Sequence, residues 1–184
     1  MFLPRELLAL LIFSSLAFSA DYQIEANIRY AAYPETILDV IQSPAPALKN
    51  RPGVIVIHGA GEKADMVEKF CVPLAKQDFV VANVEYRASD AESDVNAAAQ
   101  WFSKHADRFK VDPNQILVLG QDSGGTLAQK LVGIKIIAAI DFQNDGVHLA
   151  NKAKPGDTEL IKQTDPSQLW PQIFKWLKKR KIGA

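Results

Sequence analysis

The residues best placed to do chemistry lie in the stretch Gly120-Gln121-Asp122-Ser123-Gly124-Gly125. Glycines stand two positions before and two positions after Asp122, the spacing of a nucleophile elbow, which is a sharp turn between a strand and a helix. The central residue of such a turn has a strained backbone, and only very small residues two positions away avoid a clash. Asp122 is therefore predicted at the apex. Ser123 is expected at the next position, where its backbone N–H would complete an oxyanion hole.

A second glycine-rich turn, His58-Gly59-Ala60-Gly61, follows an apolar run. The backbone N–H groups of Gly59 and Ala60 would be exposed above the end of a strand, where they suit a developing oxyanion. An ordinary tight turn between a strand and a helix explains the tetrapeptide equally well. The turn is therefore a candidate oxyanion site, with the plain turn as its alternative.

Two side chains beyond Asp122 are candidates for the base and the acid of a hydrolase. His148 is the only histidine after Asp122, and Asp141 directly follows an apolar run. Each also has an ordinary interpretation, His148 as a solvated loop residue and Asp141 as a helix cap or turn residue. Both interpretations stay open at this point.

The composition narrows the class of protein. The 184 residues are 48% hydrophobic and 23% charged, which is typical of one soluble domain. Basic and acidic residues number 21 each, so no basic surface for nucleic acid or an anionic membrane is expected. Cys71 is the only cysteine, so the sequence predicts no internal disulfide, and no metal or cofactor site is expected.

The elements that must position these residues alternate along the chain. Unalternated apolar runs, typical of strands buried on both faces, are expected as neighbouring inner strands of a parallel sheet at residues 54–57, 79–84, 116–119 and 134–140. Residues 30–41 are expected to form its edge. Helical spacing is present at residues 66–76, 94–109, 126–131 and 170–181. The alternation predicts an α/β fold, a mostly parallel sheet with helices on both faces, whose ligands bind beyond the carboxyl ends of the strands.

Residues 1–19 are expected to be a signal peptide. Arg5 precedes an apolar run at residues 7–18, too short to span a bilayer, and Ala17-Phe18-Ser19 fits a cleavage site. An uncleaved anchor is the alternative. We therefore expect a single domain over residues 20–184, secreted or periplasmic and without stable membrane association, with residues 1–19 packing against nothing in it.

Four segments, in order, resemble the α/β-hydrolase superfamily, in particular its HGGG-type esterase and lipase branch, which includes acetyl-esterase-like and feruloyl-esterase-like secreted enzymes. They are the turn at residues 58–61, the strand end at 83–87, the segment at 112–116 and the elbow at 120–125. The resemblance implies an α/β-hydrolase fold and a small-molecule ester or acyl ligand. It also shows a departure, because Asp122 stands where the family has its catalytic serine.

The family completes its triad with a carboxylate and a histidine after later strands. Residues 123–184 leave room for about one more strand–helix pair beyond the elbow helix, so the sheet is expected to be shortened at its C-terminal end. An apical carboxylate facing the oxyanion turn would also be held ionised and unreactive by N–H groups and the helix dipole.

Three functions stay open for such a chain. The first is a degenerate esterase with weak or no carboxylester hydrolysis. The second is a hydrolase that uses Asp122 as nucleophile and His148 as base, which a hydrogen bond between the two would favour. The third is a non-catalytic binding module, which a retained apolar cleft at the strand ends would favour.

Overall fold

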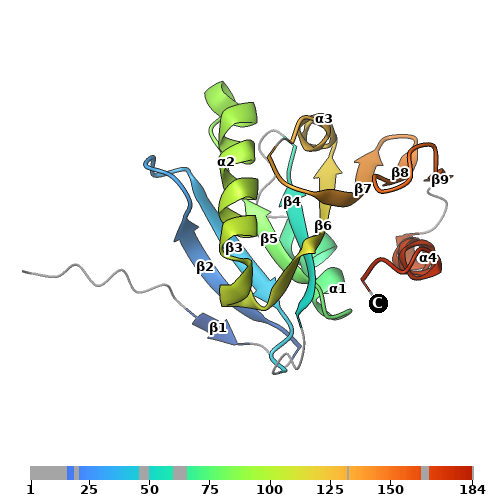
Figure 1. Cartoon of the computed structure of the whole chain (residues 1–184), viewed down its shortest axis with the longest axis horizontal. Coiled ribbons are helices and arrows are strands. Elements are labelled where there is room, and N and C mark those ends of the chain that lie inside the picture. Colours follow the sequence, from blue (N-terminus) through green and yellow to red (C-terminus); the bar gives the residue numbers. More distant parts are fainter. Residues whose placement is uncertain are drawn as a thin grey trace, which may run out of the picture.

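The computed structural model describes residues 16–18, 21–45, 50–59, 66–131, 133–162 and 166–183. The strands in this part of the chain are β1 (Leu16–Phe18), β2 (Gln23–Arg29), β3 (Ile37–Gln42), β4 (Arg51–Ile57), β5 (Val80–Val84), β6 (Val111–Gln121), β7 (Ile136–Gln143), β8 (Gly146–Asn151) and β9 (Thr158–Ile161). They form one sheet in the order β1-β2-β3-β5-β4-β6-β7-β8-β9 (Figure 1).

Helices cover both faces of this sheet. They are the π-helical turn η2 (Val67–Cys71), α1 (Val72–Ala75), α2 (Ala91–Lys104), α3 (Ser123–Gln129) and α4 (Pro166–Lys179), with 3₁₀ turns η3 (Ala88–Asp90) and η4 (Ala106–Phe109). One buried cluster joins the sheet to η2, α1 and α4, and a second joins it to α2 and α3. The α/β fold predicted from the sequence, with helices on both faces of the sheet, is therefore confirmed.

The four inner strands are also confirmed. β5, β4, β6 and β7 are neighbours, and each adjacent pair among them is parallel. Alternate residues of β4 enter opposite clusters, Val54 and Val56 on the α4 side and Ile55 and Ile57 on the α2 side. All four are fully buried, which explains why the run is apolar without alternation.

The predicted edge strand was wrong. Only residues 37–41 of the segment 30–41 belong to a strand, β3, and this strand lies inside the sheet because β2 and β1 pair beyond it. β2 escaped detection because its pairing shifts register between Glu25 and Ile28, around Asn27, whose φ is +59°. Such a bulge interrupts the apolar alternation by which a half-buried strand is recognised.

The C-terminal part differs from the predicted strand–helix pair. β7, β8 and β9 form an antiparallel meander, and α4 follows it. Gln143 pairs with Gly146 across the two residues Asn144 and Asp145, so the chain reverses in a tight hairpin. A hairpin needs no crossover helix, which is how the meander fits into so few residues.

The N-terminal expectation needs one correction. β1 pairs with β2, with Ala17 opposite Ile24, so residues 16–18 do contact the sheet. Residues 1–15 and 19–20 lie outside the described residues. No helix in the described part of the chain is long and apolar enough to cross a membrane.

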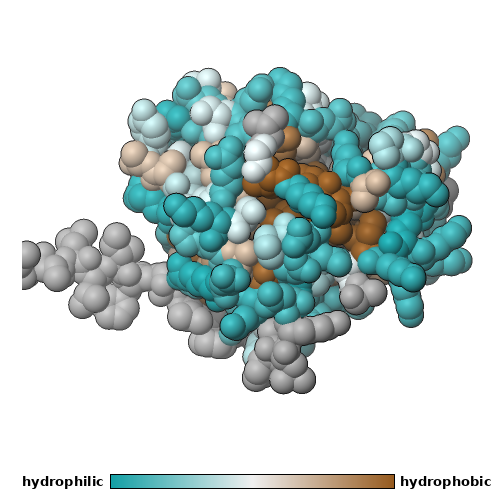
Figure 2. Space-filling view, in the orientation of Figure 1, coloured by the Kyte–Doolittle hydropathy of each residue, from teal (hydrophilic) through white to brown (hydrophobic). Residues whose placement is uncertain are grey.

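The surface seen in the same orientation is mostly hydrophilic. Figure 2 shows one gathering of hydrophobic side chains near the middle of this face, between α2 and the region of β7 and β8. Partly buried hydrophobic residues that pack against the cluster on the α2 side include Leu127, Ile134 and Ile136.

Candidate active site

The sharpest turn in the candidate site is at Asp122, between the last residue of β6 and the first residue of α3. Its backbone angles are φ 50° and ψ −116°, which a side chain rarely permits. Its N–H donates to the carbonyl of Phe142 over 2.9 Å, and its own carbonyl accepts from the N–H of Gly125 over 3.0 Å. The predicted elbow, with Asp122 rather than Ser123 at the apex, is therefore confirmed in its backbone geometry.

The glycines around Asp122 are required by close packing. A Cβ on Gly120 would clash with the backbone of Gly125, and a Cβ on Gly124 would clash with the carbonyls of Ile57 and His58. The first turn of α3 therefore lies directly against β4 and β6. This contact is what fixes the apex over the carboxyl ends of the strands.

Asp122 lines a cleft of about 270 Å³, which we call the elbow cleft. It lies at the carboxyl ends of β6 and β7, between η2 and α4, and it mixes apolar with polar walls. Its lining residues are Lys69, Phe70, Gln121, Asp122, Phe142, Gln143, Asn144, Leu169 and Trp170. The ring of Phe142 lies 4.6 Å from that of Phe70 and 6.0 Å from that of Trp170, so one wall is continuous aromatic surface.

Asp141 lies within β7, opposite Gly120 of β6, rather than after the strand as expected. A Cβ on Gly125 would clash with the Asp141 carboxylate, so this carboxylate fills the space that the glycine leaves. Burial raises the pKa of Asp141 above its ordinary value. The amide of Gln143 donates to Asp141 Oδ1 over 2.8 Å and to the carbonyl of Asp122 over 3.1 Å.

Gln143 is thus a site residue that the sequence did not single out. Its amide links the Asp141 carboxylate to the backbone carbonyl of Asp122. Among the described residues, it makes no hydrogen bond to the Asp122 carboxylate. The sequence could have indicated Gln143 by its position two residues after Asp141, because residues i and i+2 of a strand point to the same face of the sheet.

His148 is a strand residue and not the loop residue of the ordinary interpretation. It lies on β8 directly across from Asp141. Its side chain is 46% exposed, and its Nε2 lies 2.8 Å from Asp145 Oδ1. This hydrogen bond lowers the pKa of the Asp145 carboxyl. Among the described residues, no hydrogen bond joins His148 to Asp122.

The side chains of the other two histidines have partners other than Asp122. His58 is buried and stacks on Tyr86 at 4.5 Å, while its carbonyl accepts from the Tyr86 hydroxyl over 2.7 Å. His105 contacts the carbonyl of Trp101 through Nδ1 at 2.7 Å. None of the three histidines, all within the described residues, contacts the Asp122 carboxylate through a hydrogen bond.

Two of the three predicted oxyanion residues, Gly59 and Ser123, lie in the described part of the chain. Gly59 is buried two residues after the end of β4, and Ser123 is exposed at the first position of α3. Ala60 lies outside the described residues, so the oxyanion role of all three stays a prediction. In the described part of the chain, no three His, Cys, Asp or Glu side chains group as a metal site.

Comparison with known proteins gives a family match over most of the chain. The BD-FAE family model matches residues 38–162. The neutral cholesterol ester hydrolase 1 of Mus musculus is 31% identical in an alignment 103 residues long, which covers 48% of this chain and 25% of that protein. The chain therefore spans about a quarter of the length of the curated relatives it matches.

Solved structures share the fold. Esterase B of Lactobacillus rhamnosis, inhibited by a tributyrin phosphonate, superposes with a TM-score of 0.56 at 23% identity over 64% of this chain and 47% of its own. A truncated carbohydrate esterase from gut microbiota gives a TM-score of 0.51 at 24% identity, over 57% and 41% of the two chains. At these identities the likeness establishes the α/β-hydrolase fold.

Proposed function

Since the chain belongs to the BD-FAE family of α/β-hydrolase-type esterases, we propose that it is a degenerate member with weak or no carboxylester hydrolysis. One observation carries the proposal: the strained apex of the elbow is occupied by Asp122, where the resemblance expects serine. The elbow is otherwise intact, because its glycines and its backbone hydrogen bonds are in place.

The chemistry of a carboxylate nucleophile supports weak activity. Attack by Asp122 on a carboxylic ester would form an anhydride, and its hydrolysis would need a base to activate water. Two histidines lie near this end of the sheet: the Nε2 of His148 is engaged by Asp145, and His58 is buried against the ring of Tyr86. A hydrolase using Asp122 and His148 would require His148 to leave this partner, which disfavours that alternative.

The elbow cleft favours a second candidate function, a binding module that retains its pocket. Its aromatic wall and amide side chains suit a small ester or acyl ligand, the class that esterase B accommodates as a phosphonate. Calorimetric titration with an alkyl phosphonate should then show binding that Trp170→Ala weakens. Absence of binding to the unmodified chain would count against this second function.

The degenerate assignment is tested by turnover of a chromogenic aryl acetate. We expect a low kcat/KM for the natural chain, and Asp122→Ser alone should gain little, because a serine hydroxyl without a base is a weak nucleophile. The matched variant is Asp122→Ser combined with His148→Ala, which should behave like the single variant. Strong activity in Asp122→Ser that disappears in the double variant would show that His148 is a working base.

We further propose export, with cleavage before Ala20 or Asp21. The apolar run at residues 7–18 and the Ala17-Phe18-Ser19 site support it. Cleavage there would remove β1, so β2 would become the edge strand of the sheet. Most residues of β2 are already half-exposed, which suits an edge position. N-terminal sequencing of secreted protein that returned Met1 would refute cleavage.

A further inference from the structure

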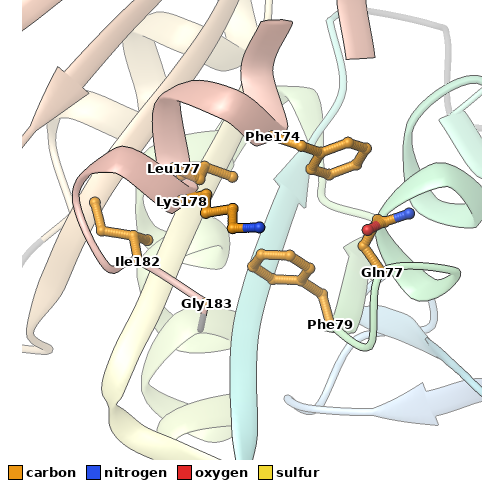
Figure 3. Close-up of a pocket in the computed structure, with 7 residues that line it drawn as sticks. All are labelled: Gln77, Phe79, Phe174, Leu177, Lys178, Ile182 and Gly183. Atoms are coloured by element: carbon orange, nitrogen blue, oxygen red, sulfur yellow. The ribbon is translucent and has the colours of Figure 1, made fainter. Parts of the chain in front are cut away.

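A second pocket, remote from Asp122, lies between α4 and the start of β5. Its volume is about 230 Å³, and we call it the α4 pocket. It is lined by Gln77, Phe79, Phe174, Leu177, Lys178, Ile182 and Gly183 (Figure 3). None of these residues lines the elbow cleft, so the two sites are separate.

The walls of the α4 pocket are apolar and fixed. Phe79, Leu177 and Ile182 are at most 7% exposed, and Phe174 is half-buried. Gly183 has φ +73°, and a Cβ there would clash closely with the ring of Phe79, so the backbone itself closes one side. Because these side chains are packed into the core, the pocket is preformed.

The rim of the pocket is polar and carries one positive charge. Figure 3 shows the Lys178 side chain reaching toward the space between the rings of Phe174 and Phe79, with Gln77 on the opposite side of the pocket. Both Lys178 and Gln77 are exposed. Among the described residues, Lys178 makes no ion pair.

Neighbouring charges are already compensated. Asp78, beside Gln77, lies 3.3 Å from Arg51, and Lys76 lies 2.9 Å from Asp21. These pairs leave the ammonium of Lys178 as the charge that faces the apolar walls. Charge complementarity therefore favours an anionic head group on an apolar body.

We propose that the α4 pocket binds a single-chain alkyl carboxylate of medium length. The carboxylate accepts a hydrogen bond from the Lys178 ammonium at the rim, and the chain lies along the apolar walls formed by Phe79, Leu177 and Ile182. A volume of about 230 Å³ is below that of sites for drug-sized ligands and suits one chain rather than two.

The test is calorimetric titration of the purified chain with octanoate, octan-1-ol and octylammonium. Octanoate should bind at least about tenfold more tightly than octanol, because its charge adds a charge-assisted hydrogen bond, and octylammonium should not bind. Hexanoate should bind more weakly by about fourfold for each methylene removed. Equal affinity for octanoate and octanol would overturn the proposal, as would binding of none of the three.

Two lysine variants locate the site. Lys178→Met should weaken octanoate binding by about tenfold and leave octanol binding unchanged, whereas the neighbouring control Lys179→Met should change neither. Amide NMR shifts on adding octanoate should appear at Phe174 and Gly183. Unchanged octanoate affinity in Lys178→Met, or shifts at Gln121 and Asp122 instead, would place the ligand elsewhere and refute the assignment.

Discussion

The backbone dihedral angles of Asp122 lie in a region of φ/ψ space that glycine occupies freely and that other residues occupy at a cost of about 1–3 kcal/mol. The apex position could be predicted from the sequence, because the elbow requires very small residues two positions before and after the apex, and Gly120 and Gly124 meet that requirement. This requirement does not depend on which residue stands at the apex. The strain remains although serine, the residue that the resemblance expects here, is absent.

Replacing Asp122 by glycine should therefore stabilise the protein. We expect Asp122→Gly to raise the free energy of unfolding by about 1 kcal/mol, because relief of backbone strain exceeds the entropy lost by glycine on folding. Urea denaturation measures this change. The control Asp122→Ala keeps the strain and should not stabilise. A glycine variant less stable than the alanine variant would contradict the strained geometry.

The partners of Asp122 were harder to predict. Asp141 and His148 were both candidates from the sequence, and the structure places them opposite each other on β7 and β8. What could not be foreseen is that His148 would bind Asp145 and that Gln143 would hold the Asp122 carbonyl. These contacts depend on the hairpin turn at residues 144–145, which sets the register of the two strands.

At the scale of elements, α4 is fastened to the meander by an ion pair. Arg180, directly after α4, donates through Nε to Asp157 Oδ2 over 2.8 Å and through a second nitrogen to Asp157 Oδ1. The guanidinium also lies 4.1 Å from the ring centre of Trp176. Hydrogen bonds from Arg180 and then Asn151 lower the pKa of Asp157 to about 2.

This pKa predicts a pH-dependent contribution to stability. Because the folded pKa of about 2 lies below the ordinary value of 3.8, the contribution is present above about pH 4 and is lost as the pH falls toward 2. Asp157→Asn should therefore lower Tm at pH 6, and its difference from the natural chain should shrink as the pH falls toward 2. Asp107→Asn, an exposed control, should show no such convergence. A difference that stays constant with pH would contradict the role of this pair.

The elements themselves were predicted unevenly. The runs in β4 and β6 are buried on both faces, so the sequence identifies them clearly as inner strands. β2 and β9 each have a single buried residue, and they escaped detection, as did β8. The helices expected at residues 94–109 and 170–181 correspond to α2 (Ala91–Lys104) and α4 (Pro166–Lys179), and they could be predicted because their apolar faces enter the two buried clusters.

At the scale of the whole molecule, the chain has the α/β-hydrolase fold, and among the described residues no hydrogen bond joins Asp122 to a histidine. The sheet carries the elbow and a cleft beside it, and the meander β7-β8-β9 follows the elbow helix α3. The fold could be predicted because it depends on many apolar residues, distributed along the chain, whose spacing shows that they are buried. The site depends on a few contacts, which the sequence could only narrow to candidates.

The most direct test of the degenerate assignment is the contribution of Asp122 itself to ester hydrolysis. We expect kcat/KM for a chromogenic aryl acetate to be low and equal, within about twofold, in the natural chain and in Asp122→Ala, because a carboxylate that performs no step contributes nothing to the rate. If Asp122→Ala lost activity by about 10²-fold or more while remaining folded, Asp122 would be a working nucleophile, and the account of a degenerate esterase would be wrong.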